Sequence, residues 1–148
     1  MNILTWSVLA LSLLVSSTSW SQDPALGAWH TLDEDTGEVK SLVILSLAQD
    51  GTMHGKISQV LQKHDGNGLC GACEGEHKNQ PIEGMTFIWG AKNTALGEWQ
   101  EGQLLDPESG KVYNSHITIG DDPHELEVRG YVGIAMFGRS QTWQRAAQ

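Results

Sequence analysis

Apolar residues alternate with polar ones along most of this chain, in short runs separated by turn-forming residues. The alternation is clear around Val43, Leu45 and Leu47, and again around Leu126 and Val128. A period of two is typical of β-strands with one buried face, whereas the helical spacing of apolar residues is almost absent here. The pattern therefore predicts an all-β protein.

The alternating runs predict about eight strands joined by mostly short turns. Turn signals such as Asp50-Gly51 and Asp106-Pro107 lie between the runs. Strands that follow one another through short links favour an antiparallel meander. The expected strands are Ala28–Leu32, Lys40–Ala48, Thr52–Leu61, Ile82–Ala91, Glu98–Leu105, Lys111–Ile119, Glu125–Val132 and Arg139–Arg145.

Residues at the two ends of this series favour a closed barrel over a two-sheet sandwich. Trp29 lies in the first strand, and Arg139 and Arg145 lie in the last. A guanidinium can stack on the indole face if these strands are neighbours, and either arginine could take that place. A barrel of about eight strands is either filled by side chains or able to hold one small ligand. We expect an up-and-down barrel whose ends are joined through Trp29.

The beginning of the chain has the pattern of a secretory signal peptide. The apolar run 3–15 is followed by small and polar residues as far as Ser21. This run is shorter than the roughly 20 apolar residues of a spanning helix, so no membrane span is expected after cleavage. We assign residues 1–21 to the signal peptide and 22–148 to a single domain. The residues before Gly27 are not expected to contribute to the fold, and export to the periplasm or the extracellular space is expected.

Charge and motifs exclude several classes of function. The net charge is −9, and the lysines and arginines are scattered singly. Nucleic-acid phosphates need clustered cations, so no nucleic-acid partner is expected. The sequence contains no nucleophile elbow, phosphate-binding loop or zinc-protease helix. We expect neither an enzyme nor a bound cofactor.

A long polar loop, residues 62–80, contains both cysteines of the protein, Cys70 and Cys73. In an exported protein, the first interpretation is a structural disulfide. A second is a redox dithiol, although no helix follows the first cysteine. A third is a metal site, because His64 and His77 flank the cysteines and two cysteines with two histidines can bind zinc.

Aromatic and apolar residues on the expected strands are candidates for lining a ligand cavity. The candidates are Met85, Phe87, Trp89 and Tyr131. Arg129 is out of phase with the apolar residues of its own strand. It would point outward if that apolar face packs inside the barrel, and otherwise into the cavity, where it could bind an acidic head group.

Several distinctive segments extend over nearly the whole chain after the signal peptide: Gly27-Ala28-Trp29, 35–37, 50–57, 70–75, 81–84, 102–113, 128–133 and 138–143. Together they resemble the bacterial secreted family of domain of unknown function 2147. The resemblance implies a lipocalin-like (calycin-like) β-barrel that is exported and has no established enzymatic activity. The Gly-x-Trp opening also resembles the lipocalin signature, in which an arginine near the last strand packs on this tryptophan.

These observations predict an exported lipocalin-like protein that binds a small amphipathic or hydrophobic molecule, such as a fatty acid or another lipid. Two other functions fit the same sequence. One is a filled barrel that acts as a protein-interaction module of the cell envelope. The other is a thiol or metal enzyme built on Cys70 and Cys73.

Overall fold

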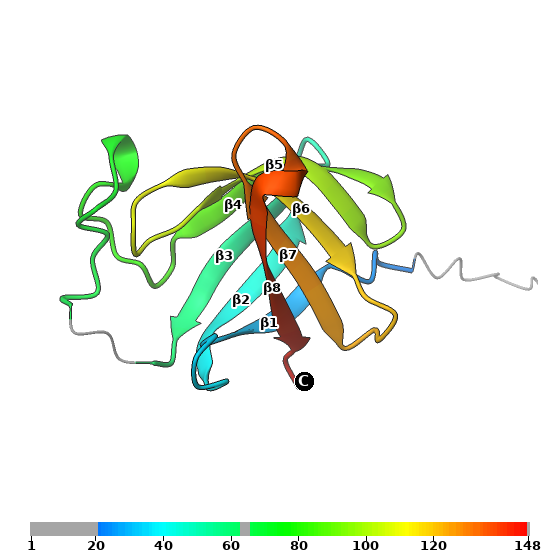
Figure 1. The fold of residues 1–148 in the computed structure, drawn as a ribbon, viewed down its shortest axis with the longest axis horizontal. Coiled ribbons are helices and arrows are strands. Elements are labelled where there is room, and N and C mark those ends of the chain that lie inside the picture. The colour runs from blue at the N-terminus through cyan, green and yellow to red at the C-terminus, as the bar shows by residue number, and fades with distance from the viewer. Residues whose placement is uncertain (1–20, 63–65, 148) are drawn as a thin grey trace, which may run out of the picture.

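The computed structural model describes residues 21–62 and 66–147, in which eight antiparallel strands form one closed barrel in chain order (Figure 1). The strands are β1 (Gly27–Leu32), β2 (Val39–Leu47), β3 (Met53–Val60), β4 (Thr86–Ala95), β5 (Glu98–Leu105), β6 (Val112–Ile119), β7 (Glu125–Tyr131) and β8 (Gly138–Arg145). Two short 3-10 helices, η1 (Gly75–His77) and η2 (Ala135–Phe137), lie in the connections. Strand β1 pairs with both β2 and β8, which confirms the expected up-and-down barrel. None of the described helices has the length and apolar character needed to cross a membrane.

The connections gather at two ends of the barrel because successive strands run in opposite directions. The β1–β2, β3–β4, β5–β6 and β7–β8 connections lie at one end, which we call the mouth. The other three turns lie at the opposite end, which we call the closed end, together with the segment before β1 and the end of β8. The longest connection, between β3 and β4, carries η1 and extends beside the barrel (Figure 1).

The segment before β1 completes the closed end, contrary to the expectation that the fold begins at Gly27. The carboxylate of Asp23 accepts hydrogen bonds from Trp99 Nε1 at 3.1 Å and from the Gly97 backbone N–H at 2.9 Å. Ala25 and Leu26 are buried, and the Ala25 carbonyl accepts a hydrogen bond from Trp29 Nε1 at 2.9 Å. Trp99 and Gly97 lie far from Asp23 in the sequence, so only the closed barrel brings them together with it.

Large apolar side chains fill the half of the barrel next to the closed end. Fully buried members are Trp29, Leu45, Met53, Ile88, Ile117 and Leu126. Burying each such side chain contributes about 1.5–3 kcal/mol to the free energy of folding. The packing is close at Gly102, where a Cβ atom would lie only 2.6 Å from Ser115 Oγ. This half of the barrel is therefore closely packed.

Strand β4 differs from its expected position. It begins at Thr86 instead of Ile82, because the Met85 N–H donates to the Ile82 carbonyl in a turn. The strand ends at Ala95, beyond the expected Ala91. The pairing with β3 also shifts, since Lys56 pairs with Thr86 while Gly55 pairs with Ile88. The extra residue on β4 is a β-bulge, which interrupts the alternation of the strand's two faces.

Candidate functional site

A cavity of about 730 Å³ opens at the mouth of the barrel. Cavities of about 300–1,000 Å³ are typical of small-molecule sites. Apolar and aromatic side chains form much of its wall: Ile57, Phe87, Leu104, Tyr113, Val128 and Trp143. The barrel is therefore packed in its closed half and hollow in its mouth half.

Strand alternation explains which residues reach this cavity. On β7, Val128 and Gly130 line the cavity, and on β8 Gln141 and Trp143 do so. Members of each pair are two residues apart, so both face the interior. Gly130 adds no side chain, and a Cβ atom there would meet Tyr113 at 3.5 Å, an ordinary van der Waals distance. The glycine therefore keeps this part of the interior open.

The bulge on β4 separates the three candidates expected on that strand. Phe87 lines the cavity, packs 6.1 Å from the Trp143 ring and is buried. Met85 is buried in the loop before the strand and is not among the lining residues. Trp89 also lies outside the lining and stacks on the His77 ring at 5.8 Å. Contact of Met85 or Trp89 with a ligand stays a prediction.

Arg129 and Tyr131 alternate with the lining positions Val128 and Gly130 of β7 and are not among the lining residues. The Arg129 guanidinium donates hydrogen bonds to Ser140 Oγ at 2.9 Å and to the carbonyl oxygens of Gly138 at 3.2 Å and Met136 at 3.4 Å. It thus holds the β7–β8 connection against β8. A ligand role for Arg129 or Tyr131 also stays a prediction.

Two acidic turns form part of the mouth. The β1–β2 turn contributes Asp33, Glu34 and Asp35 to the lining, and the β5–β6 turn contributes Asp106 and Glu108. The pKa of Asp33 is lowered mainly by a hydrogen bond from the backbone N–H of Thr36. Hydrogen bonds from the Thr36 side chain and the Asp35 N–H lower it further.

Two cations line the same mouth, and both have acidic partners. Lys40 Nζ lies 2.8 Å from Glu108 Oε1, and Arg139 pairs with Glu34. Lys40 is on β2 and Glu108 is in the β5–β6 turn, which are not neighbours in the sheet. Their ion pair therefore connects two sides of the mouth.

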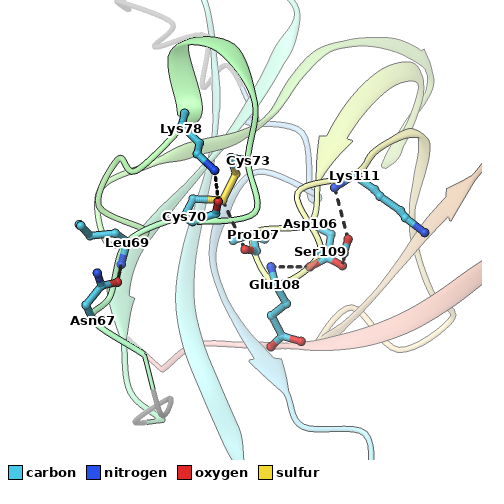
Figure 2. The surroundings of a disulfide bond; sticks show 11 residues. Asn67, Leu69, Cys70, Cys73, Lys78, Asp106, Pro107, Glu108, Ser109 and Lys111 are labelled. Carbon is cyan, nitrogen blue, oxygen red and sulfur yellow. Dashed lines mark hydrogen bonds between the residues drawn. A yellow bond between two sulfur atoms is a disulfide. The ribbon is translucent and has the colours of Figure 1, made fainter.

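The cysteine loop forms another side of the mouth. Cys70 and Cys73 form a buried disulfide, and the two residues between them, Gly71 and Ala72, line the cavity. Figure 2 shows this disulfide beside the β5–β6 turn, where Cys70 Sγ lies 3.3 Å from the Pro107 carbonyl oxygen.

Gly110 allows the cysteine loop to lie against the β5–β6 turn. Its φ of +73° favours glycine, and a Cβ atom there would be 1.9 Å from the Ala72 carbonyl oxygen. Within the loop, the Cys70 N–H donates to the Gln80 carbonyl at 2.8 Å, and the Asn79 N–H donates to the Cys70 carbonyl at 2.9 Å. The disulfide therefore fixes a loop that is docked on the barrel.

The disulfide also bears on the metal and thiol interpretations of this loop. Neither sulfur is a free thiolate while the bond is present, and thiolate is the form that binds zinc or acts as a nucleophile. His77 stacks on Trp89, and His64 lies outside the described residues. The described part of the chain contains no group of three or more acidic, histidine or cysteine side chains placed to hold a metal ion.

Arg145 is the arginine that stacks on Trp29 at the closed end. Its guanidinium carbon lies 4.1 Å from the centre of the Trp29 ring. The same group donates hydrogen bonds to the carbonyl oxygens of Pro24 at 2.6 Å and Pro123 at 3.2 Å. Arg139, the other candidate, lies at the mouth with Glu34.

The acidic residues of the mouth were not among the sequence candidates for the site, although one signal could have found them. In a closed meander, every second connection lies at the same end of the barrel. Counting strands from Trp29 would have placed the turns that contain Asp33 and Asp106 together, beside the cysteine loop. The inward position of Trp143 also follows from its phase with Gln141.

Comparisons with known proteins agree with this architecture. The family model described as "Uncharacterized protein conserved in bacteria (DUF2147)" matches residues 27–145. Among solved structures, the chain is similar to protein HP1028 from the human pathogen Helicobacter pylori, which is described as belonging to the lipocalin family. That likeness has a TM-score of 0.70 at 15% identity and covers 83% of each chain, so it shows the fold. A comparison with curated proteins finds no match. The chain therefore belongs to the bacterial family DUF2147, and its barrel is lipocalin-like.

Proposed function

We propose that this protein binds a small amphipathic molecule in the mouth cavity and serves as a carrier or sensor, without a catalytic step. The observation that carries the proposal is the division of the barrel interior into a packed half and a hollow half. Aromatic and aliphatic walls would supply affinity for the apolar part of a ligand, and the polar rim would orient its head group. The lipocalin-like fold supports a role in holding a small molecule but does not identify it.

Binding can be measured with Nile red, an uncharged fluorescent dye that brightens in apolar surroundings. We expect its emission to rise with a single saturating site, and unlabelled amphiphiles to displace it. The variant Gly130→Leu should abolish binding, because position 130 accepts a Cβ atom without a clash and a longer side chain there enters the cavity.

A matched control is Glu127→Leu, which adds the same side chain at an exposed position of the same strand. It should leave dye binding unchanged, and thermal melts should show that both variants fold. If wild-type protein that melts cooperatively binds neither Nile red nor any amphiphile tested, the binding function is rejected. Equal binding by the wild type and Gly130→Leu would place the dye outside this cavity.

We further propose that the protein is exported before it folds. The apolar segment at residues 3–15 and the small residues up to Ser21 support cleavage near this position. Cleavage there would leave Asp23 in place to complete the closed end. Mass spectrometry of the protein from the periplasmic fraction should give a chain that begins at or near Gln22. A full-length chain confined to the cytoplasm would contradict export.

One observation favours contact with another protein as a second candidate function. The β7–β8 connection exposes Val132, Ile134, Met136 and Phe137, with 58% to 77% of each residue accessible. Exposed apolar groups gathered in one place are common at interaction sites. Cross-linking in intact bacteria should give a defined adduct that the double variant Met136→Ser, Phe137→Ser loses. An unchanged adduct pattern would reject this surface as the contact.

A further inference from the structure

We infer that the ligand of the mouth cavity carries a positively charged head group of the alkylammonium type, and not the free carboxylate of a fatty acid. The inference rests on the proposed function, because it names the class of molecule that the cavity binds. Two observations support it: the charges that line the mouth and the aromatic wall.

Acidic groups exceed basic ones around the mouth. The cavity lining contains five carboxylates and two cations. Lys40 and Arg139, the two cations, are both engaged by acidic partners. The described mouth connections add four more carboxylates, Glu38, Glu74, Glu76 and Glu83, against Lys78 and Lys111. A head group that enters this mouth therefore meets a negative potential, which attracts a cation and repels an anion.

Three of the lining carboxylates have no cation within ion-pair distance among the described residues. They are Asp33, Asp35 and Asp106. Asp33 and Asp106 accept hydrogen bonds from their own turns, which fix their positions and keep their negative charge at the mouth. The backbone N–H of Thr36 lowers the pKa of Asp33, which favours the ionised form of this carboxyl. A ligand cation would add to the attraction that Asp33 receives from Lys40, and would give Asp35 and Asp106 a partner at ion-pair distance.

The wall of the cavity suits the same head group. Phe87, Tyr113 and Trp143 bring three aromatic rings to the lining. Ammonium groups bind favourably to aromatic faces, and sites for alkylated ammonium ions commonly combine such rings with carboxylates. Tyr113 is the second residue of β6, so it lies near the mouth and beside the turn that contains Asp106.

Among the residues that line the cavity, only Lys40 and Arg139 could pair with a carboxylate ligand. Taking Lys40 would leave Glu108 without its counter-ion in a mouth that already has an excess of negative charge. Taking Arg139 would release Glu34 in the same way. A cationic head group needs no such exchange, because it adds to the charges that are already present.

Matched amphiphiles test the head group directly. Dodecyltrimethylammonium, dodecanoate and uncharged dodecanol have the same chain length and can each displace Nile red below the concentration at which they form micelles. At low salt we expect the ammonium compound to bind at least about tenfold more tightly than dodecanoate, and this preference to shrink several-fold in about 0.5 M NaCl. Equal binding, or tighter binding of dodecanoate, would overturn the inference.

Variants distinguish an acidic anchor for a cationic head group from Lys40 as an anchor for an anionic one. Glu108→Gln should weaken binding of the ammonium compound, whereas Glu125→Gln at the closed end should not. If Lys40→Gln instead weakened dodecanoate binding and left the ammonium compound unaffected, Lys40 would be an anchor for an anion and the inference would fail. Dodecanol binding without an ammonium preference also overturns the inference but keeps the proposed function. Failure of Nile red and all three compounds to bind would reject the proposed function itself.

Discussion

The Arg145 guanidinium lies 4.1 Å from the centre of the Trp29 ring and joins the last strand to the first. The same guanidinium donates hydrogen bonds to Pro24, in the segment before β1, and to Pro123, in the β6–β7 turn. One side chain thus connects four parts of the chain at the closed end. The cavity at the opposite end depends on the closed sheet that this contact helps to hold.

Replacing Arg145 with alanine should lower the free energy of unfolding by about 2–4 kcal/mol, because it removes the stacking contact and two hydrogen bonds of a charged group. Arg145→Lys should be intermediate, since an ammonium keeps the charge but not the planar fork. Urea denaturation measures both. Arg139→Ala, which removes an exposed ion pair, should cost less than about 1 kcal/mol. Equal losses at positions 139 and 145 would contradict a special role for Arg145.

Removing the carboxylate of Asp23 should loosen the closed end. Asp23→Ala leaves the indole N–H of Trp99 and the backbone N–H of Gly97 without their acceptor. An unsatisfied buried donor costs about 1–3 kcal/mol. We expect a lower unfolding midpoint and a red shift of tryptophan emission. Asp35→Ala, an acidic residue at the mouth, is the control, and an unchanged emission spectrum in Asp23→Ala would show that the segment before β1 is not docked.

Replacing Ser115 with alanine should raise the free energy of unfolding by about 0.5–2 kcal/mol, because a buried hydroxyl without a partner is removed. Ser140→Ala should have the opposite sign, since the Ser140 hydroxyl accepts a hydrogen bond from Arg129. Thermal and urea unfolding of the ligand-free protein measure both variants. A clear loss of stability in Ser115→Ala would show that the hydroxyl is satisfied in solution.

The disulfide should act on the mouth more than on the barrel. A ring closed by Cys70 and Cys73 contributes only about 2 kcal/mol by chain entropy. The double variant Cys70→Ser, Cys73→Ser should therefore still fold. Hydrogen exchange at the Cys70 and Asn79 amides should become faster, because their hydrogen bonds hold the loop.

Gly110→Ala provides a matched control for this loop, because it disturbs the docking on the β5–β6 turn and leaves the disulfide intact. It should also accelerate exchange in the loop. If only the cysteine variant did so, the covalent bond alone would hold the loop, and the contact at Gly110 would not matter.

Acid should lower the stability of the fold, partly through protonation of Asp33. Folding lowers the pKa of this carboxyl below its ordinary value of 3.8, mainly through the Thr36 N–H. The unfolded chain then binds the proton more readily, so this stabilisation is present above the ordinary pKa and is lost as the pH falls through the folded-state pKa. The unfolding midpoint of Asp33→Asn should fall less than that of the wild type between about pH 5 and pH 2.

Thr36→Val tests the cause of this effect, because it removes one donor and keeps the carboxylate. Its loss of stability in acid should lie between those of the wild type and Asp33→Asn. The pKa of Asp50 is also lowered, mainly by the Thr52 hydroxyl and then by the Thr52 backbone N–H, so a part of the acid sensitivity should remain in Asp33→Asn. Identical pH profiles for the wild type and Asp33→Asn would contradict this assignment.

The strands and their closure could be predicted from the sequence, because alternation and the Trp29–arginine pair are visible without a structure. The separation of Phe87, which lines the cavity, from Trp89, which does not, could not be predicted, since a bulge on β4 interrupts the alternation of its two faces. Asp23 was missed for another reason. Its partners, Trp99 and Gly97, become its neighbours only when the barrel closes, and no local pattern records such a contact.

The route of the chain has a practical consequence for anyone who wishes to use this protein. Residue 23 and Arg145 are both anchored at the pole opposite the opening. A dye, a bead or a fusion partner attached beyond either of them would therefore leave the entrance facing free solution. An immobilised detector for small molecules could be built on this barrel without altering any residue that lines the cavity.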